Sequence, residues 1–235
     1  MSVDKTAIRN AATVIVIRDR DTAPRILMGQ RGARAAFMPN KFVFPGGAVD
    51  PGDAHISLAG HTPAPCHARL LEGSDAGLAH AVSVAAIREL WEETGLILGT
   101  PGAWAGAPPP DWHSFAATGH LPTAAPLQFV FRALTPPGRP RRFDARFFLV
   151  DVDDIASDPD DFAAASDELS HLQWVPLTEA RRFDMPFITE VVLAEIEARA
   201  ADRTAPASVP YFRNNDEESL FLRLHGHKTP YEDPA

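Results

Sequence analysis

This sequence of 235 residues has only one cysteine, no long apolar run and no excess of positive charge. The single cysteine, Cys66, excludes an intrachain disulfide and is typical of a reducing cytoplasm. No run reaches the roughly 18 apolar residues that a membrane-spanning helix needs, and the first residues lack the blocks of a signal peptide. The net charge of -9 argues against binding of long nucleic acids. We therefore expect a cytoplasmic protein that binds neither a membrane nor a nucleic acid polymer.

Six short apolar stretches in the chain are typical of buried strands. They lie at residues 12–17, 25–30, 41–44, 127–134, 145–152 and 172–175. A polar turn at 18–24 separates the first two stretches, which predicts that they form an antiparallel pair.

Two helices are predicted, one between these strands and one after the last of them. The first covers about 78–94 and ends at Gly95, a residue suited to a left-handed C-terminal cap. The second is an amphipathic helix at 186–200, with an expected inner face of Phe187, Val191, Ala194 and Ala198. Residues 50–77 and 100–126 show no clear periodicity and are expected to be irregular. This alternation predicts an α/β (α+β) fold with a mixed β-sheet and helices on both sides.

The stretch AIRELWEETGL (residues 86–96) crowds three glutamates onto the first helix. At 100° per residue, Glu89, Glu92 and Glu93 fall within about a third of the circumference. Such neighbours repel each other by a few tenths of a kcal/mol per pair, and a helix C-terminus disfavours anions. Arg88 offsets only part of this repulsion. Two explanations stay open at this point, a solvated acidic face or a site for Mg²⁺ or Mn²⁺, which prefer several carboxylate oxygens.

A glycine-rich loop precedes the acidic helix. Phe44-Pro45-Gly46-Gly47 ends a predicted strand with two residues that lack side chains, so the backbone can approach a neighbouring element or a ligand. Loop and helix together resemble the Nudix box, whose pattern is Gly, five residues, Glu, seven residues, then Arg-Glu-apolar-any-Glu-Glu-any-Gly-apolar. Residues 88–96 match every fixed position of the second half. In the first half Gly47 fits, and Asp53 stands where the family usually has Glu.

The box carries an insertion between Asp53 and Arg88. These two residues enclose 54–87, which is 34 residues instead of 7 and therefore 27 extra. An insertion at this place resembles the branch of Nudix proteins that includes peroxisomal coenzyme A diphosphatases. The resemblance implies a Nudix-like α/β/α sandwich with a mixed sheet and a catalytic helix after a Gly-rich loop. We expect one Nudix-like domain over residues 1–235, with a core at about 10–200, an insertion at about 54–80 and a C-terminal tail at about 204–235.

The resemblance also implies an activity. Nudix hydrolases cleave the diphosphate bond of a nucleoside diphosphate linked to another moiety, such as ADP-ribose or coenzyme A, with Mg²⁺ or Mn²⁺ as cofactor. By this resemblance Glu89, Glu92 and Glu93 are metal ligands and catalytic groups, with Glu89 either a ligand or the base that orients water. Glu168, just before the strand at 172–175, is another candidate catalytic base. An ordinary loop carboxylate is the alternative for this residue.

The remaining positions of the box are expected to support the site. Arg88 is expected to fix a carboxylate by a charge-assisted hydrogen bond, and Gly95 to end the helix. We expect the contact of Asp53 to be lost or mediated by water, because Asp is one methylene shorter than Glu. Gly46 and Gly47 are expected to carry the backbone past the metal and the substrate.

Arginine side chains are the candidates for gripping substrate phosphates. Arg31 and Arg142 are the main candidates among them, and Arg34 and Arg141 are secondary. The partner is expected to be a small phosphorylated nucleotide-type substrate, and a homodimer is a further expectation because Nudix proteins are often dimers. The alternative to a hydrolase is a non-catalytic Nudix-fold module that binds or senses a nucleotide. The complete set of glutamates favours the enzyme, since a silent module would be free to lose these charges.

Overall fold

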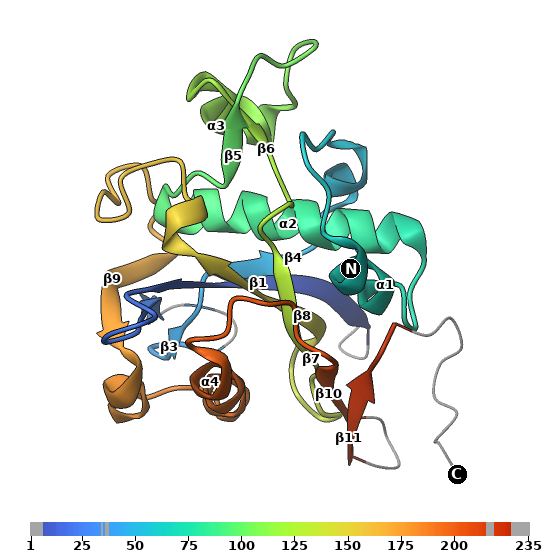
Figure 1. Cartoon of the computed structure of the whole chain (residues 1–235), viewed down its shortest axis with the longest axis vertical. Helices are drawn as coiled ribbons and strands as arrows, with labels where there is room; N and C mark the ends of the chain where they lie inside the picture. Colours follow the sequence, from blue (N-terminus) through green and yellow to red (C-terminus); the bar gives the residue numbers. More distant parts are fainter. Residues whose placement is uncertain (1–6, 34, 36–37, 215–218, 227–235) are drawn as a thin grey trace.

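The computed structural model describes residues 7–33, 35, 38–214 and 219–226 (Figure 1). Its strands are β1 (Ile8–Arg18), β2 (Arg25–Arg31), β3 (Phe42–Val43), β4 (Gly46–Ala48), β5 (Gly99–Pro101), β6 (His120–Pro122), β7 (Gln128–Leu134), β8 (Arg142–Asp151), β9 (Leu169–Pro176), β10 (Val209–Asn214) and β11 (Ser219–Leu224). Its helices are α1 (Ala64–Leu70), α2 (Ala76–Thr94), α3 (His113–Ala117) and α4 (Phe187–Arg199), with 3₁₀ turns η1 (Pro51–His55), η2 (Pro110–Trp112), η3 (Val152–Asp154) and η4 (Leu177–Arg182).

Nine of these strands form one mixed sheet. Its order is β11-β10-β7-β8-β1-β2-β3, with β4 also paired to β1 and β9 to β2. The central strand β1 runs parallel to β8 and antiparallel to β2, which confirms the predicted antiparallel pair. Figure 1 shows α2 on one face of the sheet and α4 on the other. The expected mixed sheet with helices on both sides is therefore confirmed.

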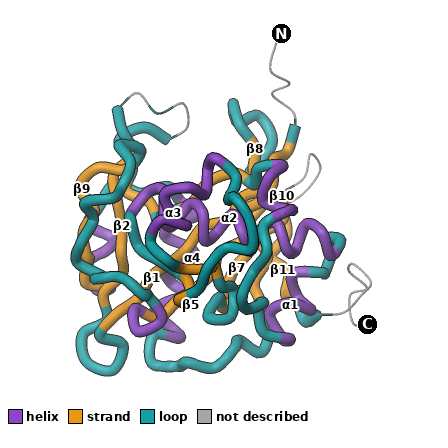
Figure 2. Tube along the Cα trace, turned by 90° about the horizontal axis from the view of Figure 1, so that it is seen from above, coloured by secondary structure: helices purple, strands orange, loops and turns teal. Residues whose placement is uncertain are grey.

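Alternating side chains of β1 enter two different cores, as the two-residue period of a strand requires. Val14 and Val16 pack in the core that contains the buried residues of α2. Ile15 and Ile17 pack in the core that contains the buried residues of α4. Figure 2 gives the view from above, in which helices and strands overlap because they form successive layers. Helix–sheet packing on both faces therefore holds β1 at the centre of the molecule.

Helix α2 is enclosed on almost all sides, since 14 of its 19 residues are buried. Asp75 caps its N-terminus by accepting a hydrogen bond from the Leu78 amide, so the helix starts two residues earlier than predicted. Gly95 ends it with a φ of 74°, the predicted left-handed cap. On the outer side Trp91 meets the ring of Phe115 in α3 edge to face. This burial places the glutamates of α2 in surroundings of low polarity.

The predicted inner face of α4 was wrong. Phe187 is 69% exposed, and Ala194 and Ala198 are exposed as well. The buried face is shifted along the helix and consists of Thr189, Val192, Leu193, Ile196 and Arg199. The helix buries this face and not the predicted one, because the branched side chains of this face bury more apolar surface than a face with two alanines.

The segments expected to be irregular contain short elements. The region 50–77 holds η1 and α1, and the region 100–126 holds η2, α3 and the two-stranded sheet β5–β6. The expected tail from 204 contains β10 and β11, which extend the main sheet beyond β7, while its residues 215–218 and 227–235 lie outside the described part. The short helices were missed because they are only one or two turns long. Across the helices that the structure describes, none is long and apolar enough to cross a membrane.

Candidate functional site

A cleft of about 750 Å³ opens on the face of the sheet that carries α4. Its floor exists because α4 covers only part of that face. Ile15 and Ile17 of β1 are buried beneath α4, whereas Ala11 and Thr13, two steps earlier on the same face, line the cleft. Its walls include the Gly-rich loop, residues of α2, the loop before β9 and the start of α4. The volume is in the usual range for a small-molecule site.

The Gly-rich loop fits against α2 so closely that side chains are excluded. A Cβ atom on Gly47 would lie 2.4 Å from each oxygen of the Glu89 carboxylate. Gly46 has a φ of 156°, and its Cβ would lie 2.4 Å from the carbonyl oxygen of Ala12. The Gly46 amide also donates a hydrogen bond of 2.7 Å to Oε2 of Glu93. The two glycines therefore leave room for, and bind, the carboxylates of α2.

Arg88 is the centre of a buried ion network. Its Nε and Nη2 donate to the two carboxylate oxygens of Asp53 at 2.9 and 3.1 Å. Its Nη1 donates to Glu89 at 2.9 Å and to Glu92 at 3.0 Å, and its Nη2 also reaches the Ala48 carbonyl at 2.9 Å. The expectation of a lost or water-mediated contact for Asp53 was wrong. The turn η1, which starts at Pro51, brings the shorter side chain close enough for a direct bidentate pair.

Arg88 is paired with three carboxylates, those of Asp53, Glu89 and Glu92, and the pKa values of the three glutamates of α2 are all raised. Burial raises the pKa of Glu89 to about 7, against the opposing effect of Arg88 and with a further contribution from Glu92. Burial raises the pKa of Glu93 to about 8, although the Gly46 amide stabilises the carboxylate. Burial also raises the pKa of Glu92. The site thus carries more negative charge than its own cations balance.

Glu168 joins this group from a distant part of the chain. It lines the same cleft, and its charge contributes to the raised pKa of Glu89, Glu92 and Glu93. The Ser166 amide donates a 2.8 Å hydrogen bond to the Glu92 carbonyl and so fastens this loop to the end of α2. The structure therefore brings Glu168 together with the three glutamates of the helix.

The type of donor in this group suits a hard divalent cation. Buried carboxylates with raised pKa values and too little positive charge gain from a cation such as Mg²⁺ or Mn²⁺. Among the described residues, however, no three acidic, histidine or cysteine side chains are gathered as a ready-made metal cage. Arg88 holds Glu89 and Glu92 in its own ion pairs. The residues fit a metal by chemistry, and Arg88 binds Oε1 of Glu89 and Oε2 of Glu92, one oxygen of each carboxylate.

The two main arginine candidates differ in position. Arg31 lines the cleft, and its Nε is buried without a hydrogen-bond partner in the described part of the chain. Arg142 is not part of the cleft lining. Its guanidinium donates to the carbonyls of Thr135 at 3.2 Å and Asn214 at 3.3 Å. This placement corrects the expected substrate contact of Arg142 to a structural one, because Arg142 lies on a strand whose alternate residues point away from the cleft.

Other cleft residues escaped the sequence prediction or had a minor place in it. Arg141 lines the cleft, and Arg34 lies outside the described residues. The prediction missed three further cations of the lining, Arg9, Lys41 and Arg139. It also missed an apolar wall that includes Leu134, Phe143, Phe147, Met185, Phe187, Ile188 and Phe212. No local motif marks these residues, because they come from β7, β8, β10 and the start of α4.

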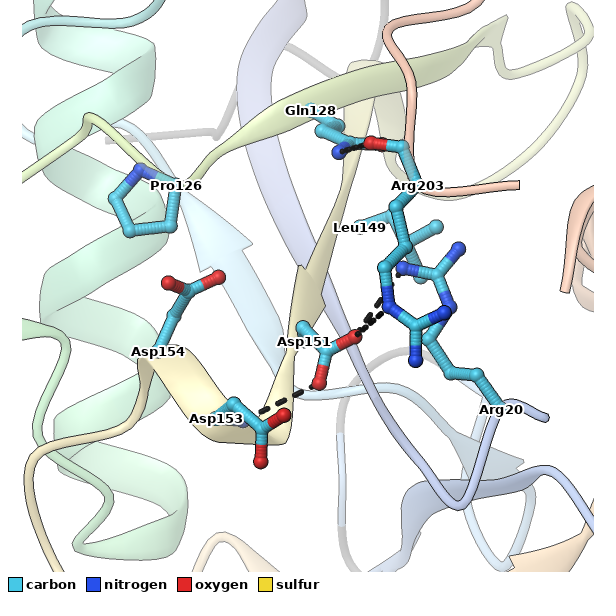
Figure 3. Close-up of a pocket in the computed structure, with 8 residues that line it drawn as sticks. All are labelled: Arg20, Pro126, Gln128, Leu149, Asp151, Asp153, Asp154 and Arg203. Carbon is cyan, nitrogen blue, oxygen red and sulfur yellow. Dashed lines mark hydrogen bonds and ion pairs between the residues drawn. The ribbon is translucent and has the colours of Figure 1, made fainter. Parts of the chain in front are cut away.

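A second cavity of about 250 Å³ lies beside β8 and η3 (Figure 3). Its acidic residues are Asp151, Asp153 and Asp154. Asp151 is already paired with Arg20 at 3.3 Å and lies 3.7 Å from Arg203. Figure 3 shows both arginines directed at this carboxylate. The cavity contains none of the candidate residues of the sequence analysis, so the larger cleft is the candidate functional site.

Comparisons with known proteins agree with the fold and with the acidic helix. A model of the NUDIX domain family matches residues 79–196. A putative nudix hydrolase 7 from Caenorhabditis elegans is 32% identical over 179 residues, which cover 71% of this chain and 51% of that protein. The chain thus spans about half the length of this relative. The crystal structure of a NUDIX hydrolase from Alicyclobacillus acidocaldarius is similar with a TM-score of 0.61 and 27% identity, over 86% of this chain and 99% of that one.

Proposed function

Since the chain belongs to the NUDIX domain family, we propose that it is a metal-dependent hydrolase of nucleoside diphosphates linked to another moiety. One observation carries the proposal. Glu89 and Glu92 of α2 line the same cleft as Arg31, so a cation-binding acidic group and a phosphate-binding cation face one space. A diphosphate needs both groups, because its negative charge repels an attacking water unless cations neutralise it.

Each residue has a defined part in this reaction. Glu89, Glu92 and Glu93 would hold Mg²⁺ or Mn²⁺, which would neutralise phosphate charge and acidify a water. Arg31 binds a phosphate oxygen, and Glu168 accepts the proton of the attacking water. Water attacks one phosphorus, the bridging P–O bond breaks, and two phosphate monoesters leave. The Gly46 amide keeps Glu93 in place through its hydrogen bond of 2.7 Å.

Hydrolysis of a compound panel tests the proposal. Purified protein with Mg²⁺ or Mn²⁺ is expected to release a monophosphate from ADP-ribose, coenzyme A or a related compound, with products resolved by mass. Glu93→Gln is expected to abolish turnover, since the amide keeps the shape of the side chain and loses the charge. Glu190→Gln, on the exposed side of α4, is the matched control. If no compound of the panel is cleaved with either metal, the proposal of a hydrolase is contradicted.

The ion pairs of Arg88 favour one alternative, a nucleotide-binding module without turnover. In the structure Arg88 binds one carboxylate oxygen of Glu89 and one of Glu92, which leaves fewer oxygens for a metal. Calorimetric titration with ADP-ribose separates the two functions. Binding without hydrolysis in the presence of Mg²⁺ supports the module, whereas turnover supports the enzyme.

Finer features belong to the same proposal. The insertion in the box supports the coenzyme A diphosphatase-like branch, and coenzyme A is in the panel for this reason. A cytoplasmic location is proposed from the lone, buried Cys66, and a homodimer from the family resemblance. Light scattering of the purified chain measures its oligomeric state.

A further inference from the structure

Two segments outside the family match bind each other. The insertion precedes the match at 79–196, and β10 and β11 follow it. Glu72 of the insertion is only 4% exposed, and its Oε2 accepts hydrogen bonds from the amides of His225 at 2.9 Å and Gly226 at 2.8 Å. Arg69 donates to the Ala207 carbonyl at 3.0 Å. Figure 2 shows α1 beside β11. The insertion thus holds one end of the strand pair β10–β11, the end at which β10 begins and β11 finishes, since Val209 lies opposite Leu224.

This strand pair forms part of the cleft. β10 pairs in parallel with β7, with Phe212 opposite Ala133, and Phe212 and Asn214 both line the cleft. Asn214 is 3% exposed and donates a 2.8 Å hydrogen bond to the Leu134 carbonyl. The Arg142 guanidinium binds the Asn214 carbonyl, which gives Arg142 its structural role. Two segments beyond the family match therefore position one wall of the cleft.

The chemistry of this wall differs from that of the acidic end. It presents aromatic and aliphatic side chains, and Phe187 among them is 69% exposed. Exposed aromatic groups in a concave site usually serve binding. In the sheet order, β10 and β7 lie beyond β8 and β1, while β4 with Gly46 and Gly47 lies against β1. A bound molecule that places its diphosphate at the acidic end extends its other parts across the sheet toward Phe212.

We propose, on the basis of the proposed function, that the braced pair β10–β11 selects substrates whose second moiety is apolar or aromatic. Phe212 is the contact residue and Glu72 a positioning residue. Such a moiety removes apolar surface from water against Phe212, whereas a small or strongly polar one gains nothing there. The selective contact at Phe212 then comes from a segment outside the family match.

Two esters that differ only in this moiety test the inference. They are ADP esterified on its β-phosphate with methanol or with 3-phenylpropanol. We expect the unmodified protein to show a kcat/KM at least about tenfold higher for the phenylpropyl ester, which is the effect of burying about one aromatic group. Phe212→Ala is expected to reduce this ratio about fivefold through KM. Phe212→Leu is expected to keep most of the ratio.

Phe221→Ala is the matched control for Phe212→Ala. Phe221 lies on β11 and contacts the Phe212 ring with a centroid distance of 6.2 Å, but it is 56% exposed and outside the cleft lining. We expect the kcat/KM ratio of the two esters in Phe221→Ala to stay within about twofold of the ratio in the unmodified protein. Equal reduction by both variants would overturn the role of Phe212 as contact residue, and so would a ratio near one in the unmodified protein.

Glu72 tests the brace separately. Glu72→Ala removes the acceptor for His225 and Gly226 and is expected to lower the ester ratio through KM, whereas Glu72→Gln keeps an acceptor and is expected to restore most of it. An unchanged ratio in Glu72→Ala overturns the brace. If the protein cleaves neither these esters nor any compound of the panel, the proposed function fails. Calorimetric binding of the two esters then still tests the inference. Equal affinities then overturn it, and tighter binding of the phenylpropyl ester supports it.

Discussion

At one end of the cleft α2 presents carboxylates that a buried arginine holds, whereas at the other end β10 and α4 present aromatic side chains that main-chain hydrogen bonds hold. The acidic end is crowded, since Gly47 leaves no room for a single Cβ beside Glu89. The apolar end is open, with Phe187 69% exposed. Substitutions should therefore reduce stability or turnover strongly at the acidic end, and should change stability only slightly at the apolar end. Four predictions test this difference, from the largest expected effect to the smallest.

Removal of the central cation should break the acidic end. Arg88→Met leaves Asp53 and Glu89 buried without their ion-pair partner, and loss of one partner of a buried pair costs about 3–5 kcal/mol of the unfolding free energy. Urea unfolding at pH 8 measures this loss. Arg139→Met, an exposed cation at the other end of the cleft, is the control and should change stability by less than about 0.5 kcal/mol. Equal losses for both variants would remove the contrast between the two ends.

Gly47→Ala tests the crowding itself. The new Cβ would lie 2.4 Å from the Glu89 carboxylate and should displace it, with a loss of turnover of about a hundredfold, the size usually seen when a catalytic group is misplaced by about 1 Å. Gly52→Ala, in the turn η1 that follows β4, is the control, since a Cβ at Gly52 meets no atom within 4 Å. Steady-state kinetics on any substrate found in the panel measures both. Turnover near the original value in Gly47→Ala would show that Glu89 is not held as the structure has it.

The charge imbalance at the acidic end predicts how stability depends on pH. Glu89 and Glu93 have pKa values of about 7 and about 8 in the folded protein, against 4.5 as the ordinary value. Between these limits the folded chain holds protons that the unfolded chain has released, so the free energy of unfolding falls as pH rises. We expect the melting temperature in EDTA to drop by several degrees between pH 5 and pH 8, and Mg²⁺ to restore it at pH 8.

A control variant checks the cause of that pH dependence. Glu93→Gln cannot release a proton, so its melting temperature should fall less steeply between pH 5 and pH 8. A melting temperature in EDTA that rises over this range, or an equally steep fall in Glu93→Gln, would contradict the raised pKa of Glu93.

The two ends also differ in how far the sequence predicts them. The glutamates, Arg88 and the cap at Gly95 lie within eight residues of one helix, where a local period and a known spacing suffice. The apolar wall depends on the parallel pairing of β10 with β7, about 80 residues apart, and local patterns carry no information on such pairing. Glu168 was a candidate from the sequence, but local patterns could not predict that it approaches α2. The structure shows this approach, because the Ser166 amide binds the Glu92 carbonyl and holds the loop there.

The smallest effect on stability is expected at Phe187, which the sequence analysis predicted on the inner face of the helix at 186–200. Phe187→Ser removes a ring that is 69% exposed and should change the unfolding free energy by less than about 0.5 kcal/mol. Val192→Ala, on the buried stripe of the same helix, should cost about 1–3 kcal/mol, because it leaves a cavity in the core. Urea unfolding of the two variants compares them directly. A large loss of stability in Phe187→Ser would show that this ring belongs to the core and not to the apolar wall of the cleft. A small loss together with weaker binding of the phenylpropyl ester would support its place in the apolar wall.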